Sequence, residues 1–339
     1  MKPYDVADHE YSLLPEGKKW KLVWNDEFDG KELDETKWSF RRHIMGCKHE
    51  TYTDAEGIEL DGNSNLIFRV IEKDGKFYSC QLQTGENYMD RPGDTNFKKF
   101  TWPIAKISTP KFMHKFGYYE CRARLQRKAG WWSAFWLQSP CQGSTLNPAV
   151  SGVEMDIIES FSPGVVMHNI HWDGCGADWK RAGKPEFEIW PGDENDFHRF
   201  GMLWDKSGYT FYIDGRESWH VDGPVSEIEQ FILISTECLG YRFPGESPHE
   251  GLKEAAKDDP MKQALFRCYQ RLNKDVSRKK LTKEERDRLY ALALDLHFDA
   301  RQDPSISFEE FDSSLATENL CALCGIQREI GQVGRPKKS

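Results

Sequence analysis

Three acidic residues stand in one short apolar segment, Glu154-Met155-Asp156-Ile157-Ile158-Glu159. Side chains of a regular strand alternate between its two faces, so Glu154 and Asp156 share a face and Glu159 falls on the other. A β-bulge, which adds one residue between Asp156 and Glu159, returns Glu159 to the shared face. The spacing therefore predicts three carboxyl groups on one surface of a bulged strand.

Paired carboxyl groups on one strand can carry out acid-base chemistry on a glycosidic bond. With the bulge, the two glutamate Cα atoms lie roughly 13 Å apart at most, and side chains leaning inward can approach the ~5–5.5 Å carboxyl separation of retaining glycosidases. Crowded negative charge raises a carboxyl pKa, which keeps one group protonated as an acid. The competing interpretation is an acidic strand face in solvent, which is disfavoured because like charges along one strand face are destabilising.

Strand patterns dominate the chain up to about residue 240. Asp74-Gly75 and Asp214-Gly215 each separate two apolar runs, as in hairpins with two-residue turns. The run at 132–138 is apolar on both faces and predicts a central strand. The expected strands cover residues 66–71, 77–82, 118–125, 132–138, 209–213, 217–221 and 231–236. Many short strands with turn signals predict an all-β sandwich or jelly roll.

The chain has 339 residues and changes character near residue 249. All twelve tryptophans lie between Trp20 and Trp219, and only four of the 27 glycines lie in the last 90 residues. We expect one β domain over residues 1–249, a helical extension of unknown role over 250–330, and a disordered basic terminus over 331–339. Two capping boxes, Thr282-x-x-Glu285 and Ser307-x-x-Glu310, support the helical prediction.

Composition excludes several classes of protein. No run of about 18 apolar residues predicts a transmembrane helix. Residues 250–339 hold 17 Lys and Arg against 16 Asp and Glu, a net charge of +1. Because the whole chain has a net charge of −9, residues 1–249 have a net charge of −10. A body this acidic is a poor partner for nucleic acid or an anionic membrane. The first 20 residues lack an apolar signal segment, so we expect a cytoplasmic protein, or a secreted one if an upstream signal was removed.

The nine cysteines are odd in number and scattered, which is typical of reduced thiols rather than a disulfide framework. Cys321-x-x-Cys324 is the one tight pair. It has no second such pair and no nearby histidine pair, so we interpret it as two thiols on a helix rather than a zinc site.

Several motifs occur in a familiar order. They are 22–30 (LVWNDEFDG), 117–124 (GYYECRAR), 130–136 (GWWSAFW), the Glu154-x-Asp156-x-x-Glu159 strand, 168–172 (HNIHW), and 196–204 followed by 209–215. Together, over roughly residues 20–242, they resemble family 16 of the glycoside hydrolases, the laminarinase, lichenase, agarase and carrageenase group. The resemblance implies a concanavalin A-like jelly roll and an enzyme of polysaccharide degradation.

The resemblance also implies roles for the three carboxylates. Glu154 would be the nucleophile, Glu159 the acid/base and Asp156 an assisting residue in a retaining endo-β-glycanase. By double displacement it would cleave internal β-glycosidic bonds of a polysaccharide or oligosaccharide of the β-glucan or galactan class. Two alternatives stay open: a non-catalytic carbohydrate-binding jelly roll, which has no use for the three carboxylates, and a transglycosylase with the same site.

Candidate substrate-binding residues surround these carboxylates. Trp132 and Trp136 match the tryptophan-containing strand of the family, and a sugar's C–H face packs well on an aromatic ring. Two interpretations of His171 stay open: a residue that forms a hydrogen bond near Glu159, or a hydrogen-bonded histidine of the core. Further candidates are Glu50, Tyr52, Arg91, Trp102 and Glu237. Cations that could meet sulfate or uronate are interpreted instead as solvated loop residues: Arg41, Arg42, His43, Arg91, Lys98 and Lys99.

One departure from the family pattern concerns the end of the β domain. The family's sandwich normally ends in a strand of the type V-D-Y-V-R-V-Y, and no such segment follows residues 231–240. The helical extension either replaces that strand or leaves a sheet edge exposed. Many family members hold a structural calcium with an acidic residue of that strand, so its absence argues against the metal here. We expect no cofactor and no metal ligand among the site residues.

Overall fold

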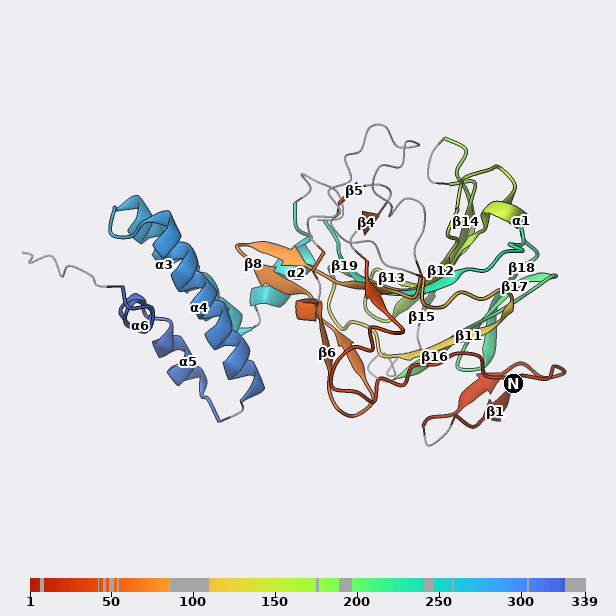
Figure 1. The fold of residues 1–339 in the computed structure, drawn as a ribbon, viewed down its shortest axis with the longest axis horizontal. Coiled ribbons are helices and arrows are strands. Elements are labelled where there is room, and N and C mark those ends of the chain that lie inside the picture. The colour runs from red at the N-terminus through yellow and green to blue at the C-terminus, as the bar shows by residue number, and fades with distance from the viewer. Residues whose placement is uncertain are drawn as a thin grey trace, which may run out of the picture. The chain divides into compact units, whose positions relative to one another are not determined.

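A computed structural model describes most of the chain and divides it into two compact units, Met1–Leu252 and Lys253–Ser339. The sequence placed this boundary after residue 249. The two units are described separately (Figure 1). The described residues are 1–6, 9–41, 43–44, 47–48, 52–53, 55–85, 110–174, 177–188, 197–240, 247–257, 259–303 and 305–326.

The first unit is an antiparallel β-sandwich, as the strand pattern predicted. Its larger sheet has the order β15-β14-β13-β12-β19-β10-β3, and its smaller sheet has the order β11-β16-β17-β18. Apolar side chains from both sheets, among them Met155, Ile157, Phe200 and Met202, are fully buried in one core between the layers. Alternation along β13 therefore points Met155 and Ile157 into the core and leaves the other face of the large sheet for polar side chains.

The strands of the large sheet are β3 (Ser39–Phe40), β10 (Gln81–Gln83), β12 (Trp131–Gln138), β13 (Glu154–Ser160), β14 (Val165–Trp172), β15 (Lys180–Glu188) and β19 (Phe231–Cys238). Those of the small sheet are β11 (Gly117–Ala123), β16 (His198–Asp205), β17 (Gly208–Ile213) and β18 (Arg216–Val221). Shorter elements are β1 (Lys2–Tyr4), β2 (Ser12–Leu14), β4 (His43–Ile44), β5 (Cys47–Lys48), η1 (Ala55–Gly57), β6 (Ile58–Leu60), β7 (Leu66–Phe68), β8 (Ile71–Lys73), β9 (Lys76–Tyr78) and α1 (Pro148–Ser151).

Both predicted hairpins are present. Asp74 and Gly75 have φ values of 53° and 74° between β8 and β9, and Asp214 and Gly215 have 47° and 76° between β17 and β18. Two consecutive positive φ values are the geometry of a type I′ turn, which favours Asp-Gly. The predicted strand over 66–71 is interrupted: Leu66–Phe68 (β7) pairs with β6, residues 69 and 70 belong to no strand, and Ile71 begins β8, which pairs with β9.

The motif at 22–30 resembles the opening strand of the family, but these residues form no strand in this protein. Leu22 and Val23 are 46% and 55% exposed, whereas Trp24 stacks on Phe112 with ring centroids 5.3 Å apart. Aromatic packing therefore holds this segment on the sandwich without a hydrogen-bonded ladder. After β19, the described residues form helices and no strand, so the helical extension does not replace the missing final strand within the part of the chain described.

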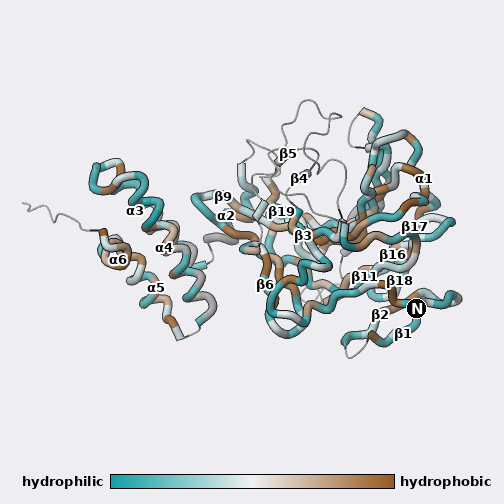
Figure 2. The backbone as a smooth tube through the Cα atoms, viewed as in Figure 1, coloured by the Kyte–Doolittle hydropathy of each residue, from teal (hydrophilic) through white to brown (hydrophobic). Residues whose placement is uncertain are grey.

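The helical extension begins with α2 (Glu250–Lys257), whose Leu252 is buried within the first unit. It continues as α3 (Pro260–Ser277), α4 (Lys283–Gln302), α5 (Phe308–Ser314) and α6 (Thr317–Leu323). Both predicted capping boxes are present, at Thr282/Glu285 and Ser307/Glu310. Hydrophobic and hydrophilic residues alternate along the backbone of α3 and α4 (Figure 2).

Apolar side chains of α3 to α6 form a core of their own, which includes Leu289 and Phe311. Cys321 is buried in this core and Cys324 packs against it. Among the described helices, none is long and apolar enough to cross a membrane.

Candidate active site

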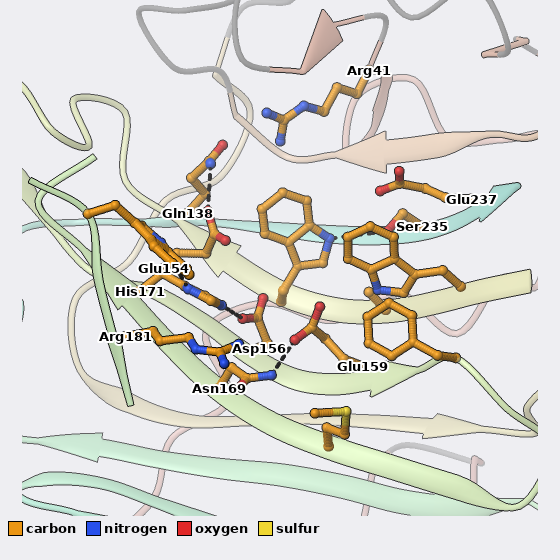
Figure 3. A pocket seen from close by; sticks show the side chains of 16 residues that line it. Arg41, Gln138, Glu154, Asp156, Glu159, Asn169, His171, Arg181, Ser235 and Glu237 are labelled. Atoms are coloured by element: carbon orange, nitrogen blue, oxygen red, sulfur yellow. Dashed lines mark hydrogen bonds and ion pairs between the residues drawn. The ribbon is translucent and has the colours of Figure 1, made fainter. Parts of the chain in front are cut away.

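The predicted bulge in β13 is confirmed by the register of its neighbour. Asp156 pairs with Asn169 of β14, and Glu159 pairs with Met167, so three steps on β13 match two steps on β14. The extra residue turns Glu159 to the same face as Asp156. Glu154, Asp156 and Glu159 consequently line one pocket of about 400 Å³ (Figure 3).

Glu154 lies at one end of this row of carboxylates, and two side-chain amides hold it. Gln138 Nε2 donates to Glu154 Oε2 over 2.9 Å, and Gln142 Nε2 donates to the same oxygen over 3.3 Å. Burial and the charge of Asp156 raise the pKa of Glu154, while His171, the Gln138 amide and Arg41 act in the opposite direction. These donors and cations stabilise the anion that a nucleophile requires.

Asp156 occupies the centre of the row and pairs with a histidine. His171 Nε2 lies 3.2 Å from Asp156 Oδ2. Burial alone would lower the imidazole pKa, but the hydrogen bond and charge of Asp156, supported by Glu154 and Glu159, raise the pKa of His171 to about 9. The sequence placed His171 near Glu159, whereas its hydrogen-bonding partner is Asp156.

Trp179 also contacts His171, through both its ring face and its N–H. The rings stack with centroids 5.5 Å apart, and Trp179 Nε1 lies 3.2 Å from His171 Nδ1. An indole N–H donates only to an unprotonated ring nitrogen, so this bond and a protonated imidazole exclude each other. Trp179 is 44% exposed and Asp156 is buried, so the carboxylate determines the charge of His171.

Glu159 lies at the other end of the row and is 7% exposed. Burial, then the charge of Asp156, raises its pKa to about 8, although a hydrogen bond from Asn169 Nδ2 opposes the shift. At neutral pH this carboxyl group is therefore protonated. Both glutamates have a raised pKa from burial and the charge of Asp156, but their donors differ: two amides donate to Glu154 Oε2 and one donates to Glu159 Oε2.

Aromatic side chains form part of the pocket wall. Trp132 and Trp136 both line it, as predicted. The ring centroids of Trp132 and Phe161 lie 4.8 Å apart. Trp136 donates its indole N–H to Ser235 Oγ over 3.2 Å. Trp132 is partly exposed and offers an apolar ring beside the carboxylates, which suits the C–H face of a sugar, whereas Trp136 is only 7% exposed.

The interpretation of Arg41 as a solvated loop cation is wrong, because its side chain is buried in the pocket wall. It is 1% exposed, lines the pocket and places its guanidinium carbon 5.2 Å from the centroid of the Trp136 ring. Its backbone N–H donates to Gln81 O at the edge of β10, which fixes the start of the side chain. A cation-π contact of this kind combines positive charge with aromatic packing inside the pocket.

The remaining predicted binding residues fall in different places. Glu237 lines the pocket, and its Oε1 accepts a hydrogen bond of 2.7 Å from Gln81 Nε2. Tyr52 hydrogen-bonds to the same Gln81 amide, so its link to the pocket is indirect. Glu50, Arg91 and Trp102 lie outside the described residues, as do Arg42, Lys98 and Lys99.

Sequence reasoning missed Gln138, Asn169 and Arg181, which also line the pocket. A signal for two of them existed. Gln138 is two residues after Trp136, and Asn169 is two residues before His171, so the alternation of a strand places each on the pocket face. Arg181 is paired with His171 across β14 and β15, and that pairing cannot be inferred from local spacing.

Among the described residues, one group could bring ligand atoms together around an ion: Glu154, Asp156 and His171, whose atoms lie within 4.8 Å of one another. Each of these side chains already has a hydrogen-bonding or ion-pair partner in the pocket. We interpret the group as a proton-handling site and assign no metal to it.

Comparison with known proteins agrees with this geometry. Residues 77–228 match the model of glycosyl hydrolases family 16. The β-sandwich unit belongs to this family. It is therefore a glycoside hydrolase domain, and the matched residues include the whole carboxylate row of β13.

Two curated relatives illustrate the range of the family. The chain is 25% identical to a glucan endo-1,3-beta-glucosidase A1 of Niallia circulans over 262 residues, which cover 71% of this chain and 38% of the relative. It is also 25% identical to a beta-porphyranase B of Zobellia galactanivorans, over 71% of this chain and 81% of the relative. The chain thus spans about two fifths of the first relative and four fifths of the second.

A solved structure supports the fold assignment. The GlcNAcα1-4Gal-releasing endo-β-galactosidase of Clostridium perfringens superposes with a TM-score of 0.50 at 21% identity, covering 70% of this chain and 59% of that chain. The helical extension has a separate match, since residues 245–327 fit the model described as a family of unknown function (DUF6076).

Proposed function

We propose that this protein is a retaining endo-β-glycanase that hydrolyses internal bonds of a glycan of the β-glucan or galactan class. The observation that carries the proposal is the bulged strand that presents Glu154, Asp156 and Glu159 to one pocket. The names of the relatives, which include a glucanase, a porphyranase and an endo-galactosidase, support an endo-acting enzyme and both substrate classes.

In the first step, the Glu154 carboxylate attacks the anomeric carbon while Glu159 gives its proton to the departing glycosidic oxygen. The product is a glycosyl ester on Glu154 and a glycan with a free hydroxyl. Gln138 and Gln142 donate to Oε2 of Glu154, which favours Oε1 as the attacking atom. The raised pKa of Glu159, about 8, supplies the proton at neutral pH.

In the second step, Glu159 is a carboxylate and removes a proton from water, which attacks the glycosyl ester and releases Glu154. The two displacements restore the configuration of the anomeric carbon. Asp156 lies between the two glutamates on β13 and pairs with the imidazole of His171, so it orients that ring beside both reacting groups.

The proposal is tested with Glu154→Gln on a panel of β-glucans and galactans, read as reducing ends released and as product size. We expect wild type to cleave at least one polymer into oligosaccharides and the variant to lose at least roughly 10³-fold of that rate, because the nucleophile is absent. Glu217→Gln, an exposed glutamate of β18, is the matched control and should retain full activity. Equal rates for wild type and Glu154→Gln would leave a carbohydrate-binding protein.

The anomer formed first distinguishes a retaining from an inverting enzyme. Proton NMR of the fresh product should show the β-anomer before mutarotation. The appearance of the α-anomer first would exclude Glu154 as a nucleophile. Products longer than the starting oligosaccharide at high acceptor concentration would instead indicate transglycosylation.

A further inference from the structure

Asn169 is a buried amide whose single described side-chain hydrogen bond joins it to the proposed acid. It lies on β14 and is 6% exposed, and its Nδ2 donates to Glu159 Oε2. In the strand ladder Asn169 is paired with Asp156, the central carboxylate, whereas its side-chain amide donates to Glu159 at the end of the row. An N–H donor on Oε2 fixes which oxygen of Glu159 is held and leaves Oε1 to carry the transferred proton.

Gly183 of β15 lies directly opposite Asn169 in the strand ladder. A Cβ atom at this position would stand 2.0 Å from Asn169 Oδ1, 3.1 Å from Asn169 Cγ and 3.2 Å from the backbone oxygen of His168. The φ angle of Gly183 lies outside the left-handed region, so the backbone conformation does not require glycine here. The requirement is steric, because the Asn169 carboxamide occupies the space that a side chain would fill.

We propose that Asn169 and Gly183 together position the catalytic acid. The absence of a side chain at Gly183 leaves the space in which the Asn169 carboxamide lies, and this keeps its amide directed toward Glu159. The inference rests on the proposed function, because it assigns a partner to the acid of that reaction. Asn169 touches Glu159 but no reacting atom, so it is a positioning residue. Gly183 acts one step further away, mainly through Asn169, whose Oδ1 is the nearest atom to a Cβ at this position.

Several charged groups also face Glu159, and they set the background for any pH effect. Asp156 and Glu154 come from its own strand, His171 from β14, Arg181 from β15, Glu237 from β19, and Arg41 from the segment after β3. Replacement of Asn169 or Gly183 removes none of these charged side chains. A difference in pH dependence between the variants and wild type therefore reports the Asn169 hydrogen bond.

The test is a double-mutant cycle of Asn169→Ala, Gly183→Ala and the combination. We expect each single variant to lose roughly 10- to 100-fold in kcat/KM on the polymer, the range for a buried hydrogen bond to an ionisable group. Once Asn169 is truncated, the Cβ at position 183 meets no carboxamide. The double variant should therefore be no worse than Asn169→Ala, a strong non-additivity.

The pH profile distinguishes positioning from general damage to the sheet. The Asn169 donor favours the ionised form of Glu159, so its loss raises the pKa of the acid, and the alkaline limb of kcat/KM should move up by roughly one pH unit in both single variants. An aryl β-glycoside with a phenolate leaving group needs little protonation. Its glycosylation rate should fall less than that of the polymer, which a distorted sheet would not predict.

Additive losses, an unmoved alkaline limb, or equal losses on polymer and aryl glycoside would each overturn the inference. If Gly183→Ala alone does not fold, the double variant still decides. Both contacts with the Asn169 carboxamide are absent from it and only the 3.2 Å approach to His168 O remains, so it should fold and have the rate of Asn169→Ala. Failure of the proposed function is a separate result, because then wild type and Glu154→Gln would already be equal.

Discussion

The side-chain amide of Gln138 and the carboxylate of Glu154 form a 2.9 Å hydrogen bond between neighbouring strands β12 and β13. Gln138 is the last residue of β12, two positions beyond Trp136, and it is buried. The strand that supplies an aromatic wall therefore also supplies the donor that orients the proposed nucleophile. The same pocket holds the proposed acid with the Asn169 amide from the opposite neighbour, β14 (Figure 3).

Truncation of Gln138 should weaken the nucleophile. Gln138→Ala removes the closer of two donors to Glu154 Oε2, so the carboxylate loses both orientation and stabilisation of its charge. We expect kcat to fall roughly 10- to 100-fold, with Tm little changed. Gln142→Ala is the comparison, because its donor lies at 3.3 Å and its loss should cost less. A larger effect of Gln142→Ala than of Gln138→Ala would contradict this assignment.

The raised pKa of Glu159 predicts the alkaline limit of activity. Glu159 must be protonated in the glycosylation step, so kcat/KM should decline above about pH 8. Glu159→Gln keeps the shape but has no transferable proton, and it should lose both the activity and the limb. Measurement of kcat/KM from pH 5 to 10 checks this, and a decline centred below pH 6 would show that Glu159 is not the acid.

The same group should limit stability at high pH. The pKa of Glu159 rises from 4.5 to about 8 on folding, so between these values the native state binds the proton more tightly than the unfolded chain. The free energy of unfolding therefore falls as pH rises through this window. We expect Glu159→Gln to have a higher Tm than wild type at pH 8.5 and a similar Tm at pH 4.5. Equal differences at both pH values would exclude the raised pKa.

The pairing of His171 with Asp156 should stabilise the fold in a different pH window. The pKa of His171 is raised from 6.5 to about 9, so this contribution is complete below pH 6.5 and disappears as pH rises through 9. His171→Asn should lower the free energy of unfolding by about 1–3 kcal/mol at pH 6, since it leaves a buried carboxylate unpaired. The loss should be smaller at pH 9.5.

His220→Asn is the matched control for that measurement. His220 pairs with Asp222 over 3.0 Å, but the two side chains are 40% and 95% exposed, so the pair should contribute at most about 0.5 kcal/mol. A loss at His171 no greater than at His220 would show that the buried pair adds nothing to stability.

The carboxylate row was predictable because its signal is local. Six residues contain all three groups, and strand alternation demands a bulge to bring them together, which the register of β14 confirms. Arg41 was misread because its burial depends on distant partners: it stands over Trp136, nearly one hundred residues away in the chain. Strand alternation places Gln138 and Asn169 on the pocket face, but their partners Glu154 and Glu159 lie on the neighbouring strand, so local spacing alone does not reveal their role.

The segment 22–30 shows the opposite failure, where a motif resembled a strand but the fold gives it none. Whether β-branched and aromatic residues form a ladder depends on a neighbour with free backbone groups, and strand preference contains no information on that neighbour. Here Trp24 and Phe28 pack on aromatic rings of the sandwich, which holds the segment in place without pairing.

The packing of Leu252 predicts where the chain can be shortened. Leu252 is buried in the first unit, and a Cβ on Gly130 would stand 2.6 Å from it, so α2 begins tightly against the loop before β12. His249 N donates to Leu239 O, which ties the same segment to the end of β19. A chain ending at Lys257 keeps these contacts and removes α3 to α6, which have a core of their own. We expect it to fold with the Tm and the kcat/KM of the full chain.

A chain ending at residue 246 lacks Leu252 and should lose stability by about 2–5 kcal/mol, the range for emptying a buried leucine site. The variant Leu252→Ala in the full chain is the control, because it creates the same cavity without removing any helix. Similar losses of Tm in the shorter chain and in Leu252→Ala would show that Leu252 accounts for the loss. If the chain ending at Lys257 keeps both the Tm and the kcat/KM of the full chain, residues 258–339 contribute nothing to hydrolysis. Loss of activity on truncation at Lys257, with Tm retained, would instead assign the helical extension a role in the action on polymer.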